Sequence, residues 1–276
     1  MQAGPGSAAC RVGCWSPHRS RRRAAHAAVA LGVMLAGVCS TPFVGPARAA
    51  TQATLTGTIS PAVNNFAARP QSVGLSILAR FLTTPPGGQP ATVTQAVISF
   101  SHGATINSQL FPGCSARRLD LGGLKGCPPD TRIGTGSALG VGAGIDEPLN
   151  VTAFNGPRGR SVLFYLQGNS PIHIAQAIDA PLVPVRGRFY AYQLTLPVPE
   201  DLQVIAGVPI AVAEFQTTVR ATVTKRVRGT TVRRGYIEVP LCPAGALVPL
   251  RGIFSFIGAP TETVNSGIAC GEPPPS

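Results

Sequence analysis

Alternation of apolar and polar side chains is the feature that most restricts the fold of this chain. Residues 52–59, 73–81 and 94–100 each carry apolar side chains at every second position, and stretches rich in Pro, Gly or Asn follow them. Successive side chains of a β-strand point to opposite faces of the sheet, so this period is typical of strands with one buried face. The three segments are therefore predicted to be strands, and the breaks after them to be turns.

The same pattern continues through the second half of the chain. Residues 151–155 and 161–167 flank a short turn and are predicted to form a hairpin, and further strands are expected at 171–178, 189–196, 210–224, 236–241 and 253–257. Long helices are disfavoured, because the 276 residues include 32 Gly and 27 Pro and only 12% are charged. The prediction is an all-β fold: an antiparallel β-sandwich, Greek-key-like, with about ten strands.

The first 49 residues have the composition of an export signal. Four arginines between positions 19 and 23 precede a 12-residue apolar run at 27–38, and residues 47–49 (Ala-Arg-Ala) fit the small-x-small rule for cleavage. Residues 1–49 are therefore predicted to be a signal peptide. Residues 50–276 are predicted to be one domain, secreted or at the cell surface, with a flexible tail at 271–276.

Two alternatives for the leader stay open. Ser20-Arg21-Arg22 is half of a twin-arginine signal, so either export route is compatible with the residues. The leader could also be retained as an N-terminal membrane anchor with its basic side in the cytoplasm. No later segment is long and apolar enough to predict a membrane span after cleavage.

The cysteines that follow the leader predict covalent cross-links. Four remain, and an even number in an exported chain indicates two disulfides among Cys114, Cys127, Cys242 and Cys270. Three connectivities are possible. Local pairing closes the shortest loops, of 14 and 29 residues, and each would stabilise the fold by roughly 3–4 kcal/mol. A four-cysteine zinc site usually shows paired C-x2-C spacings, which are absent here, so neither a metal nor a cofactor is predicted.

Six basic residues within 15 positions give the strongest interaction signal. They lie on a predicted hairpin, largely on one solvent face: Arg220, Lys225, Arg226, Arg228, Arg233 and Arg234. Such a cluster could bind an anionic wall polymer or an acidic glycan. The alternative is that the charges keep an exposed strand soluble and unpaired. Nucleic acid is disfavoured, because residues 50–276 have a net charge of only +6 and Tyr236 alone adds an aromatic ring.

The chain contains few residues in patterns typical of catalysis. It has no G-x-S-x-G elbow. His102 is expected at the end of a strand, and His173 is expected on a solvated strand face. Asp130 and Glu147 lie beside prolines in predicted turns, where acids mostly contact water or nearby amides. The prediction is therefore a protein without enzymatic activity. A cell-wall or glycan hydrolase that uses such loop carboxylates is the alternative.

Two further patterns have structural interpretations. Five glycines, at positions 134, 136, 140, 142 and 144, all have even numbers and would share one face of a strand. Because Leu139 stands where a dinucleotide fingerprint has its last glycine, they are predicted to leave that strand face without side chains so that another element can approach closely. Tyr190 and Tyr192 alternate with Phe189 and Ala191. A row of this kind is more typical of a core face than of a sugar-binding platform.

Residues 127–138 read Cys-Pro-Pro-Asp-Thr-Arg-Ile-Gly-Thr-Gly-Ser-Ala. This segment resembles a C-P-x-x-S/T-x-I-G-x-G-x-A signature of exported actinobacterial proteins without assigned function. The ending from Cys242 to Cys270 is similar to the last strands of those proteins, although Thr131 stands where Ser is commoner. The resemblance implies an export signal, an all-β fold and a cell-envelope setting, and it implies no catalytic or ligand residue.

Overall fold

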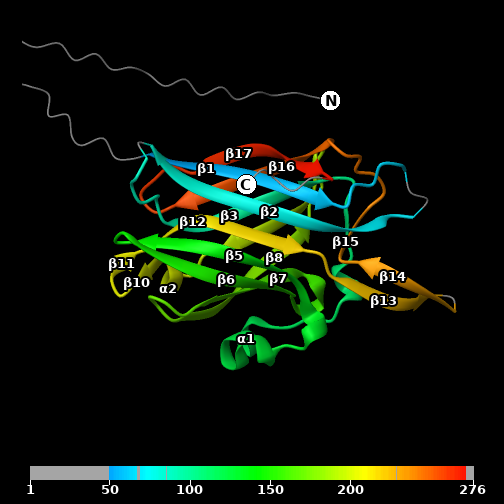
Figure 1. Ribbon diagram of the computed structural model, residues 1–276, viewed down its shortest axis with the longest axis horizontal. Helices are drawn as coiled ribbons and strands as arrows, with labels where there is room; N and C mark the ends of the chain where they lie inside the picture. The colour runs from blue at the N-terminus through cyan, green and yellow to red at the C-terminus, as the bar shows by residue number, and fades with distance from the viewer. Residues whose placement is uncertain (1–49, 67–68, 85, 228, 272–276) are drawn as a thin grey trace, which may run out of the picture. The chain divides into compact units, whose positions relative to one another are not determined.

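The computed structural model describes residues 50–66, 69–84, 86–227 and 229–271 (Figure 1). The predicted signal peptide, Arg228 and residues 272–276 of the predicted tail lie outside the described residues. Within the described part of the chain, no helix is long and apolar enough to cross a membrane.

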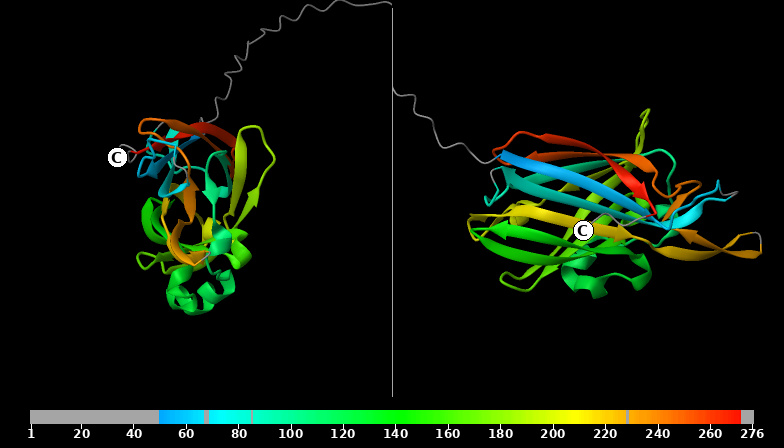
Figure 2. Two further views of the ribbon diagram at one scale, coloured as in Figure 1. Left: turned by 90° about the vertical axis from the view of Figure 1, so that its right-hand side faces the viewer. Right: turned by 45° about the horizontal axis from the view of Figure 1, so that its top comes forward.

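Eleven strands form one closed ring (Figures 1 and 2). Their bounds are β1 (Ala50–Ser60), β2 (Gln71–Thr84), β3 (Val93–Ser101), β5 (Arg132–Gly142), β6 (Ile145–Asn155), β7 (Ser161–Gly168), β8 (Ile174–Pro184), β9 (Tyr190–Pro197), β12 (Ala211–Val219), β16 (Leu247–Phe256) and β17 (Glu262–Cys270). Around the ring they follow the order β1-β17-β16-β3-β9-β8-β7-β6-β5-β12-β2, and β2 pairs with β1 again.

The β1–β17 contact is the one parallel pair of the ring, with Gly57 beside Ile268 and Ile59 beside Cys270. All other ring pairs are antiparallel, as in the β5–β6 and β6–β7 hairpins. Strand direction cannot alternate all the way around an odd number of strands, so one pair of neighbours in an eleven-stranded ring has to run in the same direction. The parallel pair follows from the strand count.

The predicted all-β fold and the predicted hairpin at 151–167 are confirmed, but the predicted sandwich of about ten strands is wrong. The chain forms a closed barrel of eleven strands. A sandwich and a barrel both bury one face of each strand, so the alternation in the sequence is the same for the two. Long-range pairing decided between them, above all β12 between β5 and β2 and β1 against β17.

Short elements cover the two ends and one side of the barrel. They are β4 (Thr105–Ile106), β10 (Val204–Ile205), β11 (Val208–Pro209), β13 (Thr222–Val227), β14 (Thr230–Gly235), β15 (Ile237–Val239), α1 (Ala116–Gly122), α2 (Glu200–Gln203) and the 3-10 turns η1 (Ser108–Leu110), η2 (Gly123–Gly126), η3 (Pro129–Thr131) and η4 (Pro157–Gly159). Figure 1 places α2, β10 and β11 at one end and the β13–β14 hairpin at the other.

The apolar stripes expected from the sequence face the inside of the barrel. Leu55 of β1, Ala79 of β2 and Ile98 of β3 all belong to the main interior cluster. A second, smaller cluster lies outside the wall, where Leu119 of α1 packs on Leu163 and Tyr165 of β7. Even positions of β7 therefore face inward and odd ones face α1, which explains why nearly all of this strand is buried.

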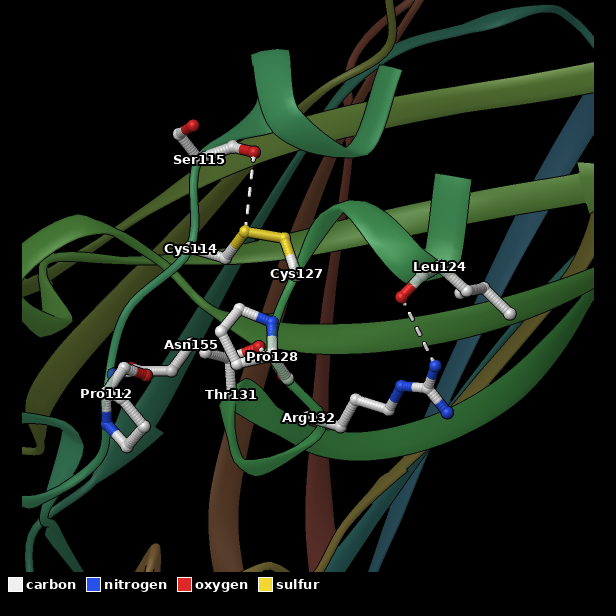
Figure 3. The surroundings of a disulfide bond; sticks show 9 residues. All are labelled: Pro112, Cys114, Ser115, Leu124, Cys127, Pro128, Thr131, Arg132 and Asn155. Atoms are coloured by element: carbon white, nitrogen blue, oxygen red, sulfur yellow. Dashed lines mark hydrogen bonds between the residues drawn. A yellow bond between two sulfur atoms is a disulfide. The ribbon is translucent and has the colours of Figure 1, made fainter. Parts of the chain in front are cut away.

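Both predicted disulfides are present, with the local connectivity. Cys114 is bonded to Cys127 around α1 and η2, and Cys242 is bonded to Cys270. Figure 3 shows the first bond beside Asn155 at the end of β6. Nearby, the Arg132 guanidinium donates a hydrogen bond to the carbonyl of Leu124 (3.3 Å), so the cross-linked loop is also tied to β5.

The glycine row of β5 has the predicted structural role at its first positions. A Cβ on Gly136 would lie 1.9 Å from the carbonyl oxygen of Gln216, and one on Gly134 would lie 2.2 Å from that of Thr218. Glycine at these positions lets the backbone of β12 approach β5 closely.

Candidate ligand-binding cavity

The interior of the barrel is not completely filled. It contains a cavity of about 190 Å³, lined almost entirely by apolar side chains, most of them from the ring strands. An apolar cavity of about 150 Å³ is enough to stay dry and to bind benzene. The space is therefore suited to a small apolar molecule or to the chain of a longer one.

Small residues on the inward faces create this space. The small residues that line the cavity include Ala79 of β2, Ala96 of β3, and Ala138 and Gly140 of β5. The interior of a barrel is filled by alternating small and large residues. Here the small residues are not matched by enough large ones to close the core.

One end of the cavity is closed by a hydrogen-bonded group. Tyr236 lines the cavity and donates its hydroxyl to Oδ1 of Asn155 (3.2 Å), and its ring packs edge-on against Phe111 (5.2 Å between centroids). The Asn155 amide in turn lies 3.0, 3.0 and 3.2 Å from the carbonyls of Ser108, Phe111 and Pro112. Burial raises the pKa of Tyr236, so its hydroxyl keeps the proton that it donates.

The other end is covered by apolar side chains from α2 and β10. Leu202 and Ile205 line the cavity from inside, together with Ile172 and Ile174 from the start of β8. The same four residues also line a depression on the outer surface, beside Asp120 and Asp201. These side chains are therefore the layer that separates the cavity from solvent.

The wall is also incompletely paired beside this layer. β8 pairs with β9 only through Leu182, Val183 and Pro184, which leaves the edge of residues 174–181 without a partner strand. One N–H of this edge, at Ala177, donates to Oδ1 of Asp120 in α1 (2.8 Å). This unpaired edge lies beside Leu202 and Ile205, which form the apolar cover of the cavity. This side of the barrel can therefore open with the least loss of backbone hydrogen bonds.

Two residues that line the cavity each carry a buried polar atom without a hydrogen-bond partner among the described residues. These atoms are Oε1 of Glu147 on β6 and Oγ1 of Thr217 on β12, and their residues are 4% and 8% exposed. Such atoms are rare in folded proteins, since each loses its water without compensation. An unpaired group that faces an apolar cavity is a natural contact for a polar group of a ligand.

The placement of Glu147 differs from the sequence prediction of a solvated turn. Glu147 is the third residue of β6 and is buried on the inward face. The signal was present, because Glu147, Leu149, Val151 and Ala153 continue one alternating series. The neighbouring proline at 148 masked it, since proline more often marks a turn than a strand.

Asp130 and Glu147 do not form a catalytic pair. Asp130 is exposed in η3, just before the start of β5, whereas Glu147 faces Gly140, eight residues further along that strand. This separation corresponds to about 26 Å of strand. Paired carboxylates of glycoside hydrolases lie within about 10 Å of each other, so the loop-carboxylate arrangement considered from the sequence is absent for these two residues.

The basic cluster lies on the β13–β14 hairpin, which projects from the barrel (Figure 1). The prediction that these charges lie largely on one face holds only in part. In the observed register Arg226 and Arg233 share one face of the hairpin, and Lys225 and Arg234 share the other. Arg220 is exposed just before the hairpin, and Arg228 lies outside the described residues.

Arg234 already has a partner. Its guanidinium donates to both carboxylate oxygens of Glu238 (2.8–3.1 Å), and Glu238 also accepts from the N–H of Gly235 (2.9 Å). Burial alone would raise the pKa of Glu238, but the hydrogen bonds from Arg234 and Gly235 and the charge of Arg234 outweigh it and lower that pKa. Arg234 is thus part of the closed end of the barrel and not a free cation.

The remaining predicted positions fall outside the cavity or within its wall. Tyr192 lines the cavity, which confirms the core interpretation of that row, and Tyr190 carries the Arg251 guanidinium over its ring (4.8 Å). His102 bonds to the carbonyl of Gly187 (2.8 Å), and His173 lines the surface depression. Within the described residues, no three potential ligands come together to hold a metal ion.

Comparisons with known proteins give no relative from which a function could be inferred. No protein-family model matches the chain, and neither the curated proteins nor the solved structures contain a significant match. The fold and the cavity define a class, that of closed β-barrels with an apolar interior space.

Proposed function

We propose that this protein is an exported, non-enzymatic binding module that holds an apolar small molecule inside its barrel. The observation that carries the proposal is the apolar cavity of about 190 Å³ inside the barrel, whose lining residues include Glu147 and Thr217, each with an unpaired polar atom. A closed core without function would gain stability by filling this space, at about 1 kcal/mol for each missing methyl group. Export is supported by the two disulfides and by the composition of residues 1–49.

Binding of an apolar fluorescent probe tests the proposal. Protein purified after expression of the full chain should increase the fluorescence of N-phenyl-1-naphthylamine with saturable, one-to-one binding. Ala138→Leu adds three carbon atoms to the cavity lining, and it should weaken probe binding at least about tenfold, which corresponds to about 1.4 kcal/mol. Ala191→Leu is the matched control, because Ala191 alternates with the inward-facing Tyr192 and does not line the cavity. Absence of saturable binding to the unchanged protein would refute the proposal.

A second candidate is contact with an anionic wall polymer or glycan through the hairpin. It is favoured by Arg226 and Arg233, which are exposed diagonal neighbours on one face, about 5–8 Å apart. Retention on purified anionic wall polymer should be lost in Arg226→Ser/Arg233→Ser and should weaken with salt. Lys225→Ser is the control from the opposite face. Equal retention of the double variant and of the unchanged protein would discard this candidate.

A further inference from the structure

We propose that the Glu147 carboxylate is the recognition group of the cavity, and that it selects apolar ligands whose polar end is a hydrogen-bond donor, an alcohol or an amine, over ligands that end in a carboxylate. The inference rests on the proposed function, since it needs an apolar ligand in the barrel. It adds the chemical class of that ligand and the atom that contacts it.

The hydrogen bonds of Glu147 leave one side of the carboxylate free. Oε2 accepts from the backbone N–H of Ile172 (2.9 Å), whereas Oε1 has no partner among the described residues. The two ion pairs found in the described part of the chain join Arg80 to Glu214 and Arg234 to Glu238, so neither neutralises Glu147. A buried carboxyl oxygen without a donor has lost its hydrogen bonds to water and has gained none in exchange. A donor on the ligand would supply the missing hydrogen bond.

The backbone around Glu147 leaves room for its side chain. A Cβ on Gly168, at the end of β7, would lie 2.5 Å from Oε1 of Glu147 and 2.5 Å from Cδ2 of Leu149. Gly168 is itself buried. The carboxylate therefore occupies a space that a side chain at this position of β7 would otherwise fill, and Glu147 is a lining residue of the cavity.

The surroundings of the apolar cover favour the same ligand class. Asp120 and Asp201 line the depression outside Leu202 and Ile205, and Glu147 lies inside this layer, bonded to Ile172. A ligand that passes here meets carboxylates on both sides of the cover. An anionic head group would be repelled at each of them, whereas a neutral or cationic donor would be tolerated or attracted.

The test compares three ligands with the same ten-carbon chain. 1-Decanol, decylammonium and decanoate each compete at pH 7 with N-phenyl-1-naphthylamine on protein purified from the full chain. We expect decanol and decylammonium to displace the probe at concentrations at least about tenfold lower than decanoate. In Glu147→Leu the difference between decanol and decanoate should shrink at least about threefold, because the donor loses its acceptor and the anion loses its repulsion. A smaller preference for decanol should remain, because burial of the ligand carboxylate in an apolar cavity stays unfavourable.

Two further variants make the result specific. Thr217→Val removes the other unpaired polar atom of the cavity and should preserve the preference for decanol. Glu147→Gln keeps an acceptor oxygen but not the charge, so decanol binding should persist and rejection of decanoate should weaken. Circular dichroism is used to check that each variant folds. If Glu147→Leu does not fold, Glu147→Gln replaces it in the test.

The outcomes separate the two proposals. Probe binding without a preference for decanol over decanoate in the unchanged protein overturns the inference and leaves the proposed function standing. A preference that survives in Glu147→Leu or Glu147→Gln at full strength also overturns it. Failure of the unchanged protein to bind the probe at all refutes the proposed function itself.

Discussion

At the end of the barrel that carries the Cys114–Cys127 bond, the buried groups Asn155, Tyr236 and Glu238 all have hydrogen-bond partners. At the other end, Leu202 and Ile205 cover the cavity without a disulfide, and the buried Glu147 keeps one oxygen unpaired. About eight residues of β6, or roughly 26 Å of strand, separate Asn155 from Glu147. Near its start, β6 therefore carries a buried polar group that lacks a hydrogen-bond partner, and at its end it carries one whose hydrogen bonds are formed.

This difference indicates a division of roles between the two ends. A fully paired polar network in a dry environment is rigid and costly to break. An apolar cover on a strand edge that lacks a partner loses few hydrogen bonds when it moves. The disulfide end is suited to hold the barrel closed, and the α2 end is suited to admit and contact a ligand.

Asn155→Ala should have the largest effect on stability. It leaves three backbone carbonyls and the Tyr236 hydroxyl without their partner, so we expect a loss of about 4 kcal/mol in the free energy of unfolding. Urea denaturation measures the change. Asn150→Ala, at an exposed position of the same strand, should change the stability by less than about 0.5 kcal/mol. A loss below about 1 kcal/mol for Asn155→Ala would contradict the role given to the disulfide end.

Glu238→Gln should have an intermediate effect that depends on pH. The pKa of Glu238 is lowered in the folded protein, so its stabilising contribution is complete above the unfolded-state value of about 4.3 and is lost as the pH falls through the lower folded-state pKa. We expect Glu238→Gln to cost about 2 kcal/mol at pH 7. Urea midpoints of the two proteins should converge below about pH 4. A difference that stays constant down to pH 3 would show that the charge of Glu238 is irrelevant.

Glu147→Leu should have the smallest effect and the opposite sign. It replaces a buried oxygen without a donor by an apolar side chain of similar size, and water can reach the half-buried Ile172 N–H that loses its acceptor. We expect the variant to be about 1 kcal/mol more stable. Urea denaturation of Glu147→Leu, Asn155→Ala and the unchanged protein shows whether the free energy of unfolding rises or falls in each variant. Destabilisation by more than about 1 kcal/mol would remove the contrast between the two ends.

Local patterns predicted most of the elements and few of the functional contacts. The alternation in 73–81 correctly identified both a strand and its inward face, and the spacing of the four cysteines made the local disulfides the shortest closures. The basic hairpin was found, but the register that puts Arg226 and Arg233 on the same face depends on the turn. Glu147 was assigned to a solvated turn, because Pro148 obscured the start of its strand.

The sequence by itself determined that this chain forms strands with one apolar face and closes two short loops through sulfur. These properties depend on the two-residue period of the backbone and on cysteines near each other in the chain. Only the tertiary structure decided that the strands close into a ring, that small residues from separate strands leave a space in its centre, and that Glu147 faces it. Those features arise from pairs such as β1–β17, whose residues are about 210 positions apart, and a local pattern contains no information about contacts at that separation.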